Sequence, residues 1–359
     1  MDRRSFLKKA GAGAAVVSAG VTTRARAANP IEWKMVTTWP KNFPGLGTGA
    51  NALAATIEEM SGGRIKVKVY GAGEMVPPYE VFDAVSKGTA QMGHGAAFYW
   101  KGKAEAAQFF TGVPFGLNAI EMNAWLHYGG GMQLWTELYK PFGLVPLAAG
   151  NSGVQMAGWF NKEIHSMNDI KGLKMRIAGL GGDVFKAAGG TPVNIPGGEI
   201  FSSLKSGAID ACEWVGPYND LAFGLHKAAK YYYYPGWQEP GSTLECIVNE
   251  RALHDLPKDL QAIVIQAAHV SNEVLTAEFT AQNARALHSL KTEHKVLVKA
   301  IPDDVLKQLH KLSEEVVAGV ATKDAMSKKV YDSYLKFRAE VKNWHDVSEL
   351  AYYNARNVS

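Results

Sequence analysis

Two charged side chains end apolar segments of the sequence, where a folded protein could use them to bind a ligand. Arg176 lies in the run GLKMRIAG, and Glu213 and Trp214 end the run AIDACEW. A guanidinium group is a rigid fork of donors that binds a carboxylate through two parallel hydrogen bonds. Arg176 could equally form a structural ion pair. Glu213 could bind a cation, pair with Arg176 or face solvent, and Trp214 could line a cleft or belong to the core.

The segment that carries these residues, 169–214, is predicted to alternate strands and helices. This pattern is typical of α/β domains. Its second half resembles an earlier segment, because EVFDAVSKGTAQMGH at 80–94 aligns without gaps with EIFSSLKSGAIDACE at 199–213. In both, a helix closed by a glycine leads into a short buried strand. Any two αβ units could share this much; the second interpretation is that two lobes share one topology.

The two-lobed interpretation places particular residues at equivalent positions. Val36 and Arg176 would end one pair of equivalent strands, and His94 and Glu213 would end the other. Open α/β sheets bind ligands at the ends of parallel strands, and two hinged lobes can close around a ligand. We therefore expect Arg176 and Glu213 to lie in a cleft.

The rest of the chain predicts connections between the lobes. Strand and turn patterns at 144–160 and 244–257 fit two crossings from lobe to lobe. Residues 258–301 contain no glycine or proline, and their apolar stripe predicts a helix of roughly 35 residues, on the order of 50 Å long. Such a helix would lie across both lobes, although a coiled-coil partner is a competing interpretation.

Two amphipathic helices, at about 303–320 and 323–345, are predicted to end the chain. In the second, an apolar face runs from Val330 to Trp344. This face could pack on the same molecule or on a second copy.

Enzymatic motifs are not apparent. GAGEMV at 71–76 and GLGGD at 179–183 lack the GxGxxG spacing of nucleotide loops, and the chain has no GxSxG, HExxH, CxxC or Walker sequence. Its two cysteines, Cys212 and Cys246, exclude a disulfide scaffold and a four-cysteine metal site. They could pair in an oxidising compartment, but we expect buried free thiols. A cofactor-dependent periplasmic oxidoreductase remains an alternative.

The basic excess of the sequence is confined to its first 27 residues. The formal net charge is +4, from 38 basic and 34 acidic groups; without residues 1–27 these become 32 and 33. The loss of the excess argues against a nucleic-acid partner. DRRSFLKK, an apolar run and Ala25-Arg26-Ala27 follow the order of a signal peptide cleaved near Ala27, and the paired arginines resemble a twin-arginine signal. We expect export to the periplasm.

At the level of motifs, the chain resembles the solute receptors of TRAP transporters (tripartite ATP-independent periplasmic transporters). DIKGLKMRIAG, then GGTPVNIPGGEIFSSLKSGAIDACEW, carries the resemblance, which extends upstream through VPPYEVFDAVSKGTAQMGHG and downstream through the long helix. WVGPYND after Glu213 is most similar to the subgroup that binds 2-oxoacids such as pyruvate. The resemblance implies a two-lobed periplasmic-binding-protein fold of the α/β class, with a long helix across both lobes and extra C-terminal helices.

The resemblance also implies roles for individual residues. Arg176 would pair with the substrate carboxylate. Na⁺, or another hard cation such as Ca²⁺, would bridge substrate and protein without an organic cofactor, because oxygen donors suit such ions. The implied cation ligands are Gln155, Glu213, the Trp214 carbonyl and Glu239. The implied substrate contacts are Arg176, Gln155, Asn151, Trp214, Tyr99 and Asn219.

The resemblance further implies a domain division and partners. Lobe I would comprise 29–152 with 243–285, lobe II would comprise 153–242 with 286–322, and 323–359 would be a helical extension that forms a homodimer. The partner in the membrane would be a TRAP-type permease. A receptor for another acid, such as a 2-hydroxy, sugar or aromatic acid, and a sensory module are alternatives.

Overall fold

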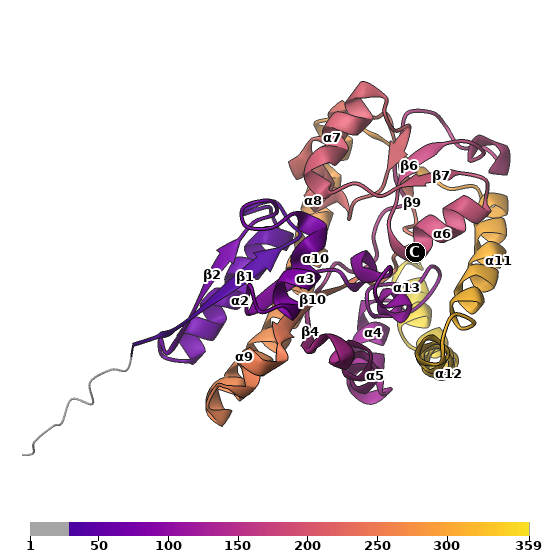
Figure 1. Ribbon diagram of the computed structural model, residues 1–359. Helices are drawn as coiled ribbons and strands as arrows, with labels where there is room; N and C mark the ends of the chain where they lie inside the picture. Colours follow the sequence, from indigo (N-terminus) through magenta and orange to yellow (C-terminus); the bar gives the residue numbers. More distant parts are fainter. Residues whose placement is uncertain (1–28, 359) are drawn as a thin grey trace, which may run out of the picture.

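A computed structural model describes residues 29–358 and places the strands in two separate sheets (Figure 1). The predicted export signal at 1–27 lies outside the described residues. No helix in 29–358 is long and apolar enough to cross a membrane. The α/β class with two sheets, a long helix and additional C-terminal helices is confirmed.

The first sheet has five strands in the order β2-β1-β3-β10-β4. Its strands are β1 (Ile31–Thr37), β2 (Ile65–Tyr70), β3 (Met92–Gly95), β4 (Leu144–Asn151) and β10 (Thr243–Asn249). β1 pairs in parallel with β2 and β3, whereas β10 is antiparallel to β3 and β4.

The second sheet has six strands in the order β11-β9-β5-β8-β6-β7. Its strands are β5 (Gly158–Phe160), β6 (Lys174–Arg176), β7 (Thr191–Val193), β8 (Ala211–Cys212), β9 (Tyr231–Tyr234) and β11 (Leu297–Ala300). β6 pairs in parallel with β7 and β8, and β5 is antiparallel to β8 and β9.

The strand register shows that the internal repeat reflects a shared topology. Val36 lies opposite Gly93 in the first sheet, and Arg176 lies opposite Cys212 in the second. Gly93 and Cys212 are also partners in the sequence alignment of 80–94 with 199–213. Arg176 is therefore equivalent to Val36, as predicted, and Glu213 follows its strand at the position of His94.

The chain passes from sheet to sheet through two short segments. β4 of the first sheet is followed by 152–157 and then by β5 of the second, and β9 is followed by 235–242 and then by β10. The first crossing lies inside the predicted 144–160. The second precedes the predicted 244–257, which instead forms β10 and a short helix, because the turn residues Pro235 and Gly236 already end the tyrosine-rich strand.

Helices cover both sheets and connect them (Figure 1). The α-helices are α2 (Leu46–Met60), α3 (Val81–Ser86), α4 (Ala119–Tyr128), α5 (Gly131–Tyr139), α6 (Gly179–Ala187), α7 (Gly197–Ser206), α8 (Pro217–Phe223), α9 (Glu250–His254), α10 (Lys258–Thr292), α11 (Asp303–Val320), α12 (Ala325–Val347) and α13 (Glu349–Arg356). Residues Glu105–Phe110 form a 3₁₀ helix.

The predicted long helix is α10, which has 35 residues. It contacts α2, β4 of the first sheet, and α8, which connects β8 to β9 of the second sheet. Leu260 and Val264 are buried near its start, and Phe279 and Leu290 are buried further along. The helix therefore joins the apolar cores of both halves, which makes a separate coiled-coil partner unnecessary.

The two cysteines are buried in different sheets and are not bonded to each other. Cys212 ends β8 and Cys246 lies in β10. The expectation of buried free thiols is confirmed.

The apolar face of α12 packs mainly within the same molecule. Val330 and Tyr334 are fully buried against the core formed by α4, α5 and residues 105–117, whereas Trp344 at the far end is 64% exposed. The Tyr334 hydroxyl oxygen accepts a hydrogen bond of 2.7 Å from the buried Leu117 backbone N–H. This bond anchors the C-terminal helix to the first half of the chain.

We predict that Tyr334→Phe lowers the free energy of unfolding by about 1–3 kcal/mol, because it leaves the Leu117 N–H buried without an acceptor. Urea denaturation of the purified protein measures this change. The matched control is Tyr352→Phe on α13, where the side chain is 62% exposed. Equal stabilities of the two variants would show that the hydrogen bond does not hold α12 in place.

Candidate functional site

A cavity of about 20 Å³ lies between the two sheets, and both crossing segments contribute to it. We call it the cleft cavity. It is lined by Trp39, Leu46, Ala96, Phe98, Tyr99, Thr111, Ser152, Gln155, Arg176, Trp214, Val215, Glu239, Ser242 and Leu244. This volume holds a water molecule or an ion. A larger ligand therefore requires the side chains or the two halves to move apart.

Arg176 reaches the cavity from the end of β6 and is almost completely buried. Its Nη1 donates to the Glu213 carboxylate oxygen Oε1 and, at 3.0 Å, to the Glu213 backbone carbonyl. Its Nη2 lies 3.4 Å from the Tyr99 hydroxyl, and its guanidinium carbon lies 5.1 Å from the Trp214 ring centroid. Burial lowers the pKa of Arg176, but Glu213, Tyr99, Tyr79 and Glu239 together raise it above its usual value, so the arginine stays charged.

Glu213 lies behind Arg176 with one carboxylate oxygen satisfied and the other unpaired. Oε1 accepts from Arg176 and, at 3.2 Å, from the Ala178 backbone N–H. Within residues 29–358, Oε2 is buried and has no hydrogen-bond partner. Burial raises the pKa of Glu213, although the positive charge of Arg176 opposes that shift. Burying a carboxylate oxygen without a hydrogen bond is costly, so this atom is a ready ligand for a proton or a cation.

Gln155 and Glu239 face the cavity from the two crossing segments. Gln155 Nε2 donates to Glu239 Oε2 at 2.8 Å and to the Ser152 hydroxyl oxygen at 3.1 Å. The Ser242 hydroxyl donates to the same Glu239 oxygen at 2.5 Å. Burial raises the pKa of Glu239 to about 6, and Gln155 Oε1 is a second buried oxygen without a partner.

Aromatic rings form the walls around these polar groups. Trp39 makes edge contacts with Trp214, and it lies beside Tyr99 with ring centroids 6.3 Å apart. The Trp39 ring nitrogen donates at 2.8 Å to Nδ1 of the buried His94, whose pKa burial lowers to about 4. His94 is therefore neutral at pH 7 and holds Trp39 in place. His94 therefore occupies the position equivalent to Glu213 but has a different chemical role.

Six of the predicted site residues converge at or beside the cleft cavity. They are Arg176, Gln155, Trp214, Tyr99, Glu213 and Glu239. Their assigned contacts to substrate and cation stay predictions. The set contains two carboxylates, an amide oxygen and a backbone carbonyl, and residues 29–358 contain no group of three or more histidine, cysteine, aspartate or glutamate side chains that could hold a metal ion. The two unpaired buried oxygens, Glu213 Oε2 and Gln155 Oε1, fit a hard cation.

Two predicted substrate contacts do not line the cavity. The Asn151 side chain donates to the Gly241 carbonyl at 3.2 Å and accepts from the Gly153 N–H at 2.9 Å, so it fixes the two crossing segments. Asn219 Nδ2 donates at 2.8 Å to the Pro44 carbonyl, which ties α8 to the first half of the chain.

Sequence reasoning missed nine of the fourteen lining residues, among them Trp39, Phe98, Ser152 and Ser242. Trp39 follows the first strand and Ser152 follows Asn151, so their positions near strand ends could have identified both as site residues. Ser242 carries no such signal, because its position depends on the path of the second crossing segment.

Two further buried carboxylates are structural. Asp220 accepts from the Trp159 ring nitrogen at 2.9 Å and from the Tyr232 hydroxyl at 2.7 Å. Glu245 accepts from the Trp100 ring nitrogen and, at 3.0 Å, from the Tyr139 hydroxyl. Each has donors on both carboxylate oxygens, whereas Glu213 has donors on one, and neither lines the cleft cavity.

Glu245 should make the protein less stable as the pH rises. Burial raises its pKa from 4.5 to about 7. The stability that protonated Glu245 contributes to the folded protein is therefore fully present below pH 4.5, where the unfolded chain also binds the proton. This stability is lost as the pH rises to about 7. At about 1.4 kcal/mol for each pKa unit, the loss is on the order of 3 kcal/mol.

We predict that Glu245→Gln reduces the fall in unfolding free energy between pH 4.5 and pH 7, measured by urea denaturation at a series of pH values. Glu315→Gln, at an exposed position of α11, is the control and should retain the wild-type slope. A wild-type slope in Glu245→Gln would show that this carboxyl group does not titrate in that range.

Comparison with known proteins gives a family match over most of the chain. Residues 35–324 match the model of bacterial extracellular solute-binding proteins, family 7 (DctP). A monocarboxylate 2-oxoacid-binding periplasmic protein of Nostoc sp. (strain PCC 7120) is 44% identical over 329 residues, which cover 92% of this chain and 90% of that protein.

Solved structures with a similar fold contain an organic acid and a cation. A TRAP periplasmic solute-binding protein from Pseudoalteromonas atlantica, with bound sodium and pyruvate, is 39% identical at a TM-score of 0.89, over 92% of this chain and 100% of that chain. A TRAP solute-binding protein from Bordetella bronchiseptica is 38% identical at a TM-score of 0.89, over 91% and 97% of the two chains. That protein forms a dimer of mixed occupancy with calcium and picolinate in its site.

Proposed function

The chain belongs to the family 7 bacterial extracellular solute-binding proteins that serve TRAP transporters, and we propose that it binds a small 2-oxo monocarboxylate in the cleft cavity. The observation that carries the proposal is Arg176, a buried guanidinium at a strand end between the two halves of the molecule. The family consists of transport receptors and not of enzymes.

Arg176 is the proposed anchor for the substrate carboxylate. In the structure its Nη1 is occupied by Glu213, while Nη2 lies 3.4 Å from the Tyr99 hydroxyl. A substrate carboxylate would replace these interactions with a bidentate pair, which suits the planar guanidinium better than a single carboxylate oxygen does. The aromatic walls would surround a short carbon chain, and the polar groups of Gln155 and Tyr99 would lie near its 2-oxo group.

A hard cation would bind the Glu213 carboxylate once Arg176 pairs with the substrate. Glu213, Glu239, Gln155 and the Trp214 carbonyl supply oxygen donors, and two of the side-chain oxygens have no other partner. The related proteins bind sodium with pyruvate or calcium with picolinate. We therefore propose Na⁺ or Ca²⁺ as the ion that bridges the substrate and the protein.

Transport places the receptor outside the cytoplasm. We propose that the N-terminal 27 residues direct export to the periplasm by the twin-arginine route, and that the closed receptor delivers its acid to a TRAP-type permease. Lobe I would comprise 29–152 with 243–285, and lobe II 153–242 with 286–322. Hinge motion of the crossing segments would open and close the cleft.

A homodimer through the C-terminal extension, 323–359, is also proposed. The apolar residues of α12 nearest its start are buried within the molecule, but Trp344, Leu350, Tyr352 and Tyr353 are each at least half exposed. Contiguous exposed aromatic residues are typical of interaction surfaces. A second copy of the chain is the proposed partner of this patch.

We predict that pyruvate binds the purified mature protein with one site per chain and that Arg176→Lys weakens this binding at least a hundredfold. Lysine provides a point charge and not the planar fork of donors, so the bidentate pair is lost. Isothermal titration calorimetry measures both affinities.

Arg285→Lys, at an exposed position of α10, is the matched control and should bind pyruvate as the wild type does. The 2-hydroxy acid lactate and the aromatic acid picolinate, titrated in parallel, define the substrate class. If no small carboxylate binds, the proposed function is wrong; if Arg176→Lys binds pyruvate normally, the arginine is structural.

We predict that removal of the cation weakens pyruvate binding at least tenfold. Without the cation, Glu213 stays paired with Arg176, and its second carboxylate oxygen stays without a partner. The measurement is the same titration in sodium-free buffer after chelation of calcium, followed by restoration of each ion separately. Restoration by one ion identifies it. Unchanged affinity in the absence of both ions would contradict a bridging cation.

A further inference from the structure

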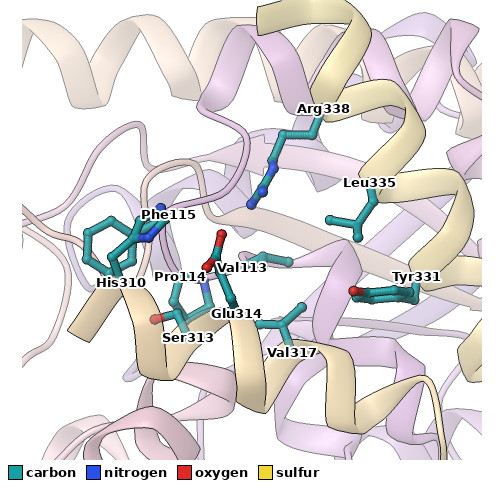
Figure 2. Close-up of a pocket in the computed structure, with 10 residues that line it drawn as sticks. All are labelled: Val113, Pro114, Phe115, His310, Ser313, Glu314, Val317, Tyr331, Leu335 and Arg338. Atoms are coloured by element: carbon teal, nitrogen blue, oxygen red, sulfur yellow. The ribbon is translucent and has the colours of Figure 1, made fainter. Parts of the chain in front are cut away.

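A second cavity lies between the C-terminal helices, outside the cleft. Figure 2 shows it between α11, α12 and the loop 113–115, with a volume of about 110 Å³. We call it the helix cavity. Val317, Tyr331 and Leu335 supply apolar and aromatic lining, and the polar side chains that line it are His310, Ser313, Glu314 and Arg338.

Two opposite charges point into the helix cavity from different helices. Arg338 of α12 extends its guanidinium group toward the centre, and Glu314 of α11 extends its carboxylate toward the same space (Figure 2). Within residues 29–358 neither side chain has an oppositely charged group within 4.0 Å, whereas the neighbouring Lys336 approaches Glu340 on its own helix. The cavity thus presents one cationic and one anionic group to the same occupant.

The two charges determine which kind of molecule can bind in the helix cavity. A monocarboxylate would pair with Arg338 but would also face the Glu314 carboxylate, and an amine would meet the reverse conflict. A molecule with both an ammonium and a carboxylate group satisfies the two side chains together. Val317, Tyr331 and Leu335 then offer apolar contact to a short side chain.

The cavity also joins the two halves of the molecule. Val305 and Leu309 of α11 belong to the core behind the second sheet, whereas Val317 of the same helix belongs to the core that holds α12. Phe115, on the cavity wall, has a φ of 54°, a left-handed conformation that is costly for a residue other than glycine. Its N–H donates at 2.8 Å to the carbonyl of Trp237, in the second crossing segment.

From these observations we propose that the helix cavity is a second binding site, which holds a small zwitterionic α-amino acid with an apolar side chain. Arg338 binds the carboxylate, Glu314 binds the ammonium group, and the aliphatic and aromatic base accommodates the side chain. The occupant contacts elements that pack on both cores, next to the crossing segment that carries Glu239. The site is separate from the cleft cavity and does not depend on the function proposed for it.

The test compares three probes that share an isobutyl group. The purified mature chain is titrated with L-valine, with 3-methylbutanoate, which lacks the amine, and with isobutylamine, which lacks the carboxylate. Saturation-transfer NMR detects binding, and calorimetry measures affinity. We expect only valine to bind, and we expect Arg338→Gln and Glu314→Gln each to weaken valine binding at least tenfold.

Three controls make the result specific. Lys336→Gln and Glu315→Gln change exposed charges next to Arg338 and Glu314, and both should bind valine as the wild type does. Arg176→Lys should also retain valine binding; its loss in that variant would assign the signal to the cleft cavity and overturn the proposal. No valine binding up to about 10 mM, or equal binding of all three probes, would likewise overturn it.

Discussion

A guanidinium and a carboxylate are buried side by side where two parallel strands end, and the rest of the site depends on this pair. Removing two charges from water costs several kcal/mol for each ion, and only good geometry and further hydrogen bonds offset that cost. Arg176 is well supplied with acceptors, but Glu213 retains an oxygen without a partner. The unpaired oxygen supports the proposal that the pair exchanges partners with a bound acid and a cation.

The fold explains why these two groups meet. Arg176 and Glu213 end neighbouring parallel strands, β6 and β8, so their side chains emerge at one edge of the second sheet. The equivalent positions of the first sheet carry Val36 and His94, and the His94 ring holds Trp39 as a wall of the same cavity. One topology used twice thus places the charged anchor on one side and an aromatic wall on the other.

The crossing segments supply residues to the site and also join the two halves of the molecule. Gln155 and Glu239 come from the two short crossing segments, and they are hydrogen-bonded to each other. A ligand that contacts these residues would therefore contact the proposed hinge. Binding energy can then be coupled directly to the relative position of the halves.

Local sequence patterns predicted the parts of this arrangement that depend on periodicity. The glycine-closed helices and the alignment of 80–94 with 199–213 predicted the equivalence of the strand ends, and the absence of glycine and proline after Lys258 predicted α10. Asn219 shows the limit of such reasoning: its amide binds the Pro44 carbonyl because of how α8 meets the first half. Similarly, Ser242 and the helix cavity depend on contacts between distant segments that no local pattern encodes.

The central claim is that a bound acid takes Arg176 from Glu213 while a cation takes Glu213. A crystal structure of the mature protein with pyruvate and calcium, with the ion located by anomalous scattering, tests it most directly. Both pyruvate carboxylate oxygens should lie on the Arg176 guanidinium, and the ion should contact Glu213, Glu239 and Gln155. An intact Arg176–Glu213 pair, with pyruvate bound elsewhere, would contradict it.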